Sequence, residues 1–122
     1  MTSSQQQLFR YLEDRFACAQ ACTECARVCA VRAARATPDG STREALLRRR
    51  GIMCAEVCEA TCRALSDQSV TDEDGIRVQL EWCRTVCLEC AEVFDGRLGA
   101  EDGAKACREA AQACTDLLAA LD

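Results

Sequence analysis

The sequence predicts an all-α fold, an antiparallel up-down-up-down four-helix bundle with a cysteine-lined core. Twelve of its 122 residues are cysteine, and neighbouring cysteines within a run are separated by three, four or seven positions. Those separations place side chains on one face of an α-helix. Alanine, leucine, arginine and glutamate, which favour helices, dominate the rest, and Pro38 is the only proline. Short breaks between four helical stretches make consecutive helices antiparallel.

The boundaries of the four helices follow from local signals. Helices are predicted at about 4–36, 42–66, 72–94 and 100–121. Proline and glycine in the segment 37–40 end the first helix. Ser41 and Glu44 have the spacing of a capping box that begins the second helix, and Thr71 with Asp74 is the predicted cap of the third. A turn with two glycines separates the third helix from the fourth.

Length and charge limit the class of protein. The chain is long enough for a single four-helix-bundle metal-binding domain that spans 1–122. A formal net charge of −5 without a dense basic stripe argues against a nucleic-acid surface. No apolar stretch approaches the roughly 20 residues of a membrane span, and the N-terminus has no secretory pattern. We therefore expect no nucleic acid, no membrane and a cytoplasmic location, where thiols stay reduced.

Helical geometry turns the cysteine runs into one inward column. At about 100° per residue the first run covers an arc of roughly 60°, with charged residues such as Glu24 and Arg27 on the opposite face. The second run drifts further, because each four-residue step over-rotates. Antiparallel packing aligns the runs in a column roughly 20 Å long. The predicted metal ligands are Cys18, Cys22, Cys25, Cys29, Cys54, Cys58, Cys62, Cys83, Cys87, Cys90, Cys107 and Cys114.

The two ends of the column differ in the residues that border them. At one end an apolar plug that includes Leu65 and Leu118 is predicted to close the bundle. The other end, near Phe94, is bordered by small residues such as Gly51 and Gly103. We therefore predict that the mouth of the column lies at the Phe94 end.

Thiols on converging helix faces indicate a metal site. Disulfides between helical neighbours are a poor explanation, because their Cβ atoms are about 5–6 Å apart against roughly 3.5–4.5 Å in a disulfide. Soft thiolates select copper(I), zinc or iron–sulfur clusters. One copper(I) per thiolate gives a neutral column, whereas each zinc ion held by four thiolates keeps a net negative charge and iron–sulfur clusters need more room. Several copper(I) ions per chain are predicted, with zinc or iron–sulfur as alternatives.

The cysteine runs resemble those of a known family. C-x3-C-x2-C-x3-C at Cys18–Cys29, C-x3-C-x3-C at Cys54–Cys62 and C-x3-C-x2-C at Cys83–Cys90 are similar to the bacterial cysteine-rich four-helix-bundle copper storage proteins. The resemblance implies storage or buffering of many copper(I) ions with all twelve cysteines as ligands. It also implies a homo-oligomer, a dimer or a tetramer, and a copper donor protein as a partner. Without histidine, the chain would be a cytosolic-type, histidine-free variant.

Two departures from the family pattern keep other functions open. Ala111 stands where a family C-x3-C-x2-C run has its middle cysteine, and family members commonly place histidine or methionine at the mouth, whereas Met53 lies off the stripe here. One alternative is a redox or oxygen-activating enzyme with a copper or iron thiolate cluster, and another is a zinc-stabilised interaction module. Storage without catalysis is favoured over both. Trp82 is expected in the core or, as the second choice, at an oligomer interface.

Overall fold

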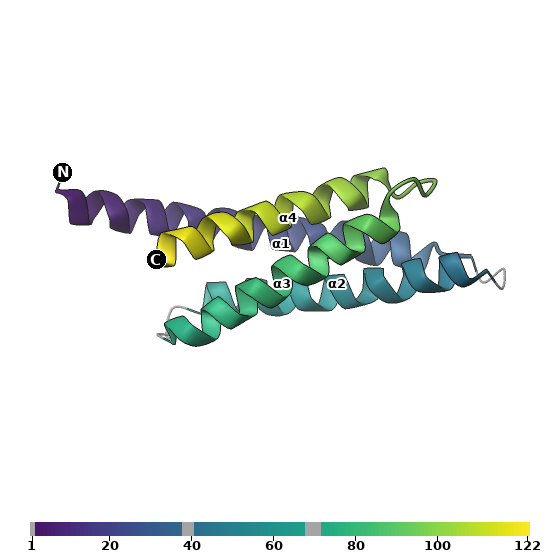
Figure 1. The fold of residues 1–122 in the computed structure, drawn as a ribbon, viewed down its shortest axis with the longest axis horizontal. Coiled ribbons are helices and arrows are strands. Elements are labelled where there is room, and N and C mark those ends of the chain that lie inside the picture. The colour runs from purple at the N-terminus through teal and green to yellow at the C-terminus, as the bar shows by residue number, and fades with distance from the viewer. Residues whose placement is uncertain (1, 38–40, 68–71) are drawn as a thin grey trace.

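The fold is an all-α four-helix bundle, as predicted. In this computed structural model the described residues are 2–37, 41–67 and 72–122. The helices are α1 (Ser3–Ala34), α2 (Thr42–Ser66), α3 (Glu73–Phe94) and α4 (Glu101–Leu121), joined in an up-down-up-down order (Figure 1). Each boundary lies within two residues of the predicted one. The described ranges contain no strand.

Side-chain caps explain where three helices begin. Thr2 and Gln5 form a reciprocal capping box at the start of α1, and the Ser41 hydroxyl accepts from the Glu44 amide, 3.1 Å away, at the start of α2. The α3 cap is Asp72, whose carboxylate accepts from the amide of Gly75 at 3.0 Å. The predicted cap, Thr71, is therefore one residue too early, and it lies outside the described residues.

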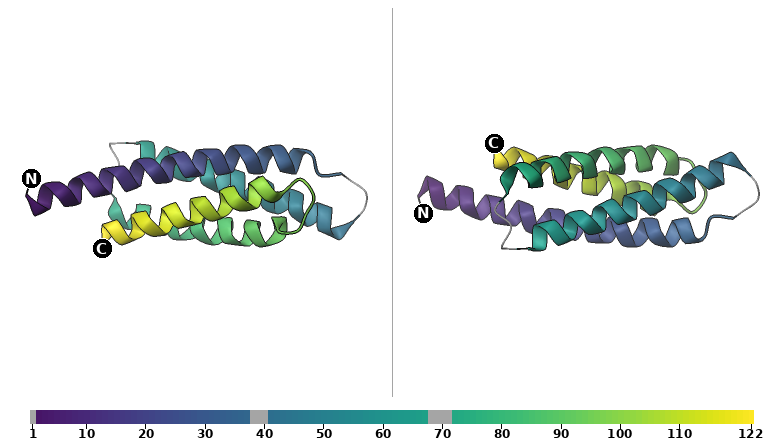
Figure 2. Two further views of the ribbon diagram at one scale, coloured as in Figure 1. Left: turned by 90° about the horizontal axis from the view of Figure 1, so that it is seen from above. Right: turned by 90° about the horizontal axis from the view of Figure 1, so that it is seen from below.

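The helices pack in a ring around a common axis. Each helix contacts its neighbours in sequence, α1 also contacts α4, and the diagonal pairs do not pack against one another in the described part of the chain. All four helices therefore border the central space. Figure 2 shows the N-terminal turns of α1 extending beyond the other three helices. None of the described helices has an apolar stretch that could cross a membrane.

Thiols occupy the centre of the core. Eleven of the twelve cysteines have no exposed surface, and Cys62 is the partly exposed one. The core position expected for Trp82 is wrong, because its side chain is 49% exposed on the outer face of α3. Cysteine, alanine and a few large apolar residues thus fill the interior, consistent with the low aromatic content of the sequence.

The predicted plug is present, and the opposite end is closed as well. Leu65 and Leu118 are buried at the plug end. At the other end Phe94 is fully buried and packs over Gly51 and Gly103. A Cβ atom at Gly103 would lie 2.5 Å from Cδ2 of Phe94, and one at Gly51 would lie 3.2 Å from its Cζ. The small residues accommodate the aromatic ring, so the predicted mouth is closed in this structure.

Candidate metal centre

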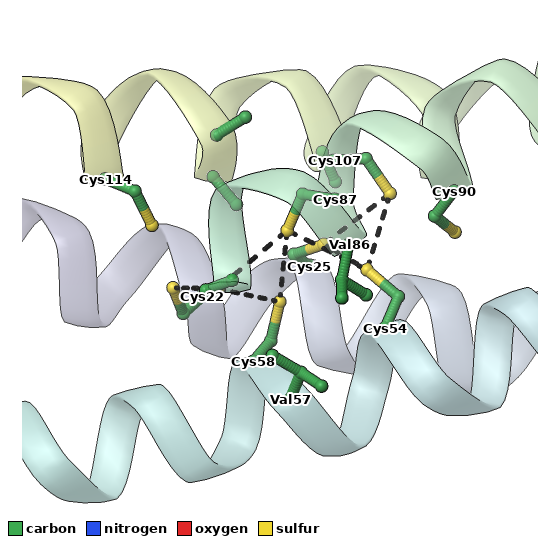
Figure 3. Close-up of a cluster of buried hydrophobic side chains, with 14 of the residues drawn as sticks. Cys22, Cys25, Cys54, Val57, Cys58, Val86, Cys87, Cys90, Cys107 and Cys114 are labelled. Carbon is green, nitrogen blue, oxygen red and sulfur yellow. Dashed lines mark hydrogen bonds between the residues drawn. The ribbon is translucent and has the colours of Figure 1, made fainter. Parts of the chain in front are cut away.

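The sulfur atoms meet across helix boundaries in the centre of the bundle. On α1, Cys18 lies 3.7 Å from Cys114 of α4, and Cys25 lies 3.7 Å from Cys54 of α2, measured between Sγ atoms. All twelve cysteines are free. Figure 3 shows the sulfur atoms of the central cysteines directed into the space between the helices. The spacings are far longer than the ~2.05 Å of a disulfide, so the thiols stay available to bind metal.

Ten cysteines form four groups, and within each group all the sulfur atoms lie within 4.8 Å of one another. The groups are Cys18, Cys22 and Cys114; Cys22, Cys58 and Cys83; Cys25, Cys54, Cys58 and Cys87; and Cys25, Cys29, Cys54 and Cys107. Each group shares at least one member with the next, through Cys22, through Cys58, and through Cys25 with Cys54. The groups therefore form one continuous chain along the bundle axis.

Two of the predicted ligands, Cys62 and Cys90, belong to no such group among the described residues. Cys62 lies at the seam between α1 and α2, where its sulfur is 3.0 Å from Oγ1 of Thr23. The Thr23 hydroxyl already donates to the Ala19 carbonyl, so the Cys62 thiol must be the donor of this contact. Two four-residue steps from Cys54 over-rotate by about 80°, which carries Cys62 out of the column.

Cys90 differs from Cys62: it faces the bundle interior but lies further along the bundle axis than the four groups. It is fully buried, and Figure 3 shows it beyond Cys54 and Cys107, towards the end that Phe94 closes. Its position therefore extends the chain of thiols by one turn of α3.

A buried hydroxyl close to the column was missed by the sequence reasoning. Thr61 is the one fully buried polar side chain in the described part of the chain. Its hydroxyl donates to the Val57 carbonyl at 2.8 Å and accepts from Nε2 of Gln79 at 2.9 Å. The spacing of three from Cys58 could have revealed its inward position. Because both partners are protein groups, Thr61 is satisfied without a metal, and the donor set of the column is sulfur alone.

Burial and hydrogen bonding raise the pKa of some thiols in the column and lower that of others. The pKa of Cys58 is raised by its hydrogen bonds with Cys22 and Cys25 and further by burial. The pKa of Cys54 is lowered, because hydrogen bonds from Cys107 and Cys25 favour its thiolate. A single thiolate can thus be stabilised by neighbouring thiols, whereas a fully deprotonated column needs cations to neutralise it.

The overlap of the groups decides which metals fit. Cys25 and Cys54 belong to both four-cysteine groups, so these groups cannot form two independent, closed zinc sites of four thiolates each. Ions that share bridging thiolates can occupy all four groups together. Soft monovalent copper fits this requirement, since one ion per thiolate leaves the column neutral and sulfur is the ligand it prefers.

Comparison with known proteins supports the same conclusion. Residues 4–119 match the family model described as copper storage protein. The chain belongs to the copper storage protein family. The resemblance noted from the cysteine spacing is thereby confirmed. A comparison with curated proteins gives no significant match.

Solved structures of a Streptomyces lividans protein, Ccsp, are similar to this member of the family. A histidine-to-alanine variant of Ccsp is 34% identical, with a TM-score of 0.65 and 97% of each chain covered. A structure described as copper loading to a cytosolic copper storage protein, with five coppers, is 33% identical, with a TM-score of 0.63 and 93% of each chain covered. Ccsp loaded with 10 copper equivalents is 33% identical at a TM-score of 0.63, covering 93% of this chain and 85% of the other.

Proposed function

We propose that this protein stores copper(I) in the chain of shared thiols, with all twelve cysteines as ligands. The observation that carries the proposal is the overlap of the four sulfur groups into one continuous chain. Ten cysteines form that chain, Cys90 extends it towards Phe94, and Cys62 lies beside it. The five-copper and ten-copper structures of the related Streptomyces lividans protein support a multinuclear site here.

Charge supports copper(I) over divalent metals. Binding requires the thiols to lose their protons, and buried thiolates are very costly without a matching positive charge. One copper(I) for each displaced proton keeps the core neutral at every stage of loading. A divalent ion bound by four thiolates would leave two negative charges in a core that has no buried cationic side chain in its described part.

Anaerobic titration of the reduced apoprotein tests the proposal. We expect roughly ten to twelve copper(I) ions per chain, about one per cysteine of the column. We also expect zinc added in excess not to displace bound copper. Saturation at three or four copper ions, or stronger retention of zinc than of copper, would overturn storage in a continuous column. A coloured, redox-active holoprotein would instead favour the enzyme alternative.

We propose further that the chain forms a homo-oligomer through the N-terminal half of α1. This part extends beyond the rest of the bundle (Figure 2) and exposes Leu8, Phe9, Leu12 and Phe16 on one face, with Phe16 65% exposed. Leu12 and Phe16 also line a surface groove that reaches Leu65. A second copy of the same apolar face would cover it.

The molar mass in solution tests this interface. Replacing Leu12 and Phe16 by lysine should convert the oligomer to a monomer, because charged side chains would have to be buried against apolar ones. The control is Val78→Lys, which changes an exposed apolar residue of α3 that is 67% exposed. A monomeric wild-type chain, or an oligomer disrupted by the control and not by the α1 variant, would contradict the proposal.

We propose further that the protein lies in the cytoplasm and receives its copper from a donor protein. Free thiols in such number persist in a reducing compartment, and the related protein is described as cytosolic. Cell fractionation of the producing organism should recover the protein with the cytoplasm, and recovery with secreted or membrane material would contradict this location.

A further inference from the structure

The closed Phe94 end suggests how copper reaches the column. We infer that copper enters at this end, and that the turn between α3 and α4 is a gate held shut by an ionic latch of Arg97, Glu44 and Arg32. The inference rests on the proposed storage function for its purpose.

The two ends of the bundle are closed by different residues, at different places in the helices. At the plug end Leu65, Ile76, Leu80 and Leu117 are all buried, and they belong to three helices, α2, α3 and α4. Opening that end would separate helices. At the other end the Phe94 ring covers the column between Gly51 and Gly103. Leu47 of α2 is also fully buried at this end, whereas Phe94 is the last residue of α3, so a movement of the turn that follows would displace its ring.

The backbone next to Phe94 is suited to such a movement. Phe94 is the last residue of α3, and the six residues that follow form a turn before α4 begins. Gly96 and Gly99 in this turn have positive φ angles of 72° and 76°. Glycine adopts both halves of φ space at little cost, so the turn can change conformation without unwinding either helix.

An ion-pair network ties this turn to the other half of the bundle. Nη2 of Arg97 lies 3.0 Å from Oε1 of Glu44 on α2, and Nη2 of Arg32 on α1 lies 3.5 Å from the same oxygen. Arg32 also donates to the Leu98 carbonyl at 3.3 Å. The Glu44 side chain is only 13% exposed, so solvent screens the network little. Glu44 is thus the central residue that holds the turn in place.

The latch is not fully satisfied. Glu44 Oε2 and Arg97 Nε are buried and have no hydrogen-bond partner within the described structure. Buried polar atoms without partners favour conformations in which water reaches them. Opening of the turn would bring both atoms into contact with water.

Behind the gate lie thiols from which copper can pass inward. Cys90 is one turn of α3 before Phe94. The backbone carbonyl of Cys29 lies beside Gly51, the glycine over which the Phe94 ring packs. The sulfur atoms of Cys29 and Cys107 are 3.4 Å apart, and those of Cys107 and Cys25 are 3.7 Å apart. An ion bound near Cys90 or Cys29 could exchange from thiolate to thiolate along these short steps, without leaving sulfur coordination.

Site-resolved alkylation of the reduced apoprotein tests the gate without using copper. The variant is Glu44→Gln, which removes the charge that holds both arginines. The control is Glu89→Gln, which removes an exposed interhelical ion pair, Arg50–Glu89 at 3.0 Å, elsewhere on the bundle. With iodoacetamide and peptide mass spectrometry, we expect Cys90 and Cys29 to react several-fold faster in Glu44→Gln than in the wild type. Cys18 and Cys114, at the plug end, should keep their wild-type rates.

Copper uptake and stability complete the test. Glu44→Gln should load copper(I) several-fold faster with unchanged capacity, and Glu89→Gln should load at the wild-type rate. Unchanged alkylation of Cys90 and Cys29, or faster reaction at Cys18 and Cys114, would overturn the gate. A urea denaturation curve separates opening of the turn from general loosening, and if Glu44→Gln does not fold, Arg97→Gln takes its place. Failure of storage would appear in the capacity, so the two outcomes are distinct.

Discussion

The middle of the column and its two ends are built on different principles. In the middle, thiols from all four helices lie close enough to share ions, and the contacts between them, such as Cys25 with Cys54 and Cys58 with Cys87, are sulfur to sulfur. At the ends, apolar side chains and, beyond Phe94, an ion-pair network replace the thiols. The number of copper ions bound is therefore set by the middle of the column, and access to them by the ends. Substitutions in the two regions should therefore affect different measurements.

The largest expected effect comes from the cysteines that two groups share. Replacing both Cys25 and Cys54 by serine should remove roughly three or four copper ions from the capacity, more than one per thiol, because both four-cysteine groups lose two ligands. The matched control is Cys62→Ser, which should cost at most about one ion. Anaerobic titration measures both. Equal losses per cysteine at the three positions would contradict a shared chain.

Acidification should weaken copper binding in the column. The pKa values of Cys18 and Cys58 are raised, by hydrogen bonds with Cys114 and Cys22 respectively and by burial, so these thiols keep their protons at neutral pH in the apoprotein. Copper must displace these protons, and binding therefore weakens as pH falls. Titration in weak buffer should show protons released as copper binds, fewer than one per copper ion because the pKa of Cys54 is already lowered. Loading without proton release would contradict a protonated apo column.

Substitutions at the Phe94 end should change stability instead of capacity. Gly103→Ala would place a methyl group 2.5 Å from the Phe94 ring, and overpacking of this kind costs about 1–3 kcal/mol. The gain from removing a helical glycine, about 0.5–1 kcal/mol, offsets part of this loss. Gly51→Ala, with contacts of 3.0–3.3 Å, should cost less. Urea denaturation of the apoproteins measures both, and a stabilised Gly103→Ala variant would show that Phe94 does not pack as described.

The smallest effect is expected at the position where the family pattern lacks a cysteine. Ala111 is buried on α4 between Cys107 and Cys114. Ala111→Cys should raise the capacity by about one copper ion, because it adds a thiol facing the column. Ala113→Cys, on a partly buried position of the same helix, is the control and should leave the capacity unchanged. Equal capacities of the two variants would mean that position 111 does not face bound copper.

Features that depend on helical periodicity were predictable from the sequence. The helix bounds and the burial of eleven thiols follow from spacing, since residues three and four apart share a helix face wherever the helix packs. Cys62 was expected in the column, and its partial exposure corrects this expectation: two four-residue steps after Cys54 rotate it outward, towards Thr23.

Features that depend on contacts between distant segments were not predictable. Small residues at positions 51 and 103 suggested an opening, but only the fold brings the Phe94 ring into that space. Glu44 was recognised as part of a helix cap, whereas its ion pairs join it to residues 12 positions before and 53 positions after it in the chain. Such pairings arise from tertiary packing, and no local pattern encodes them.

A crystal structure of the protein loaded anaerobically with copper(I), with copper located by anomalous scattering, tests the central claim most directly. The account predicts a continuous series of copper ions along the bundle axis, with thiolates of Cys25 and Cys54 bridging ions of adjacent groups. Copper ions confined to the surface, or isolated ions in separate sites with no shared thiolate, would contradict it.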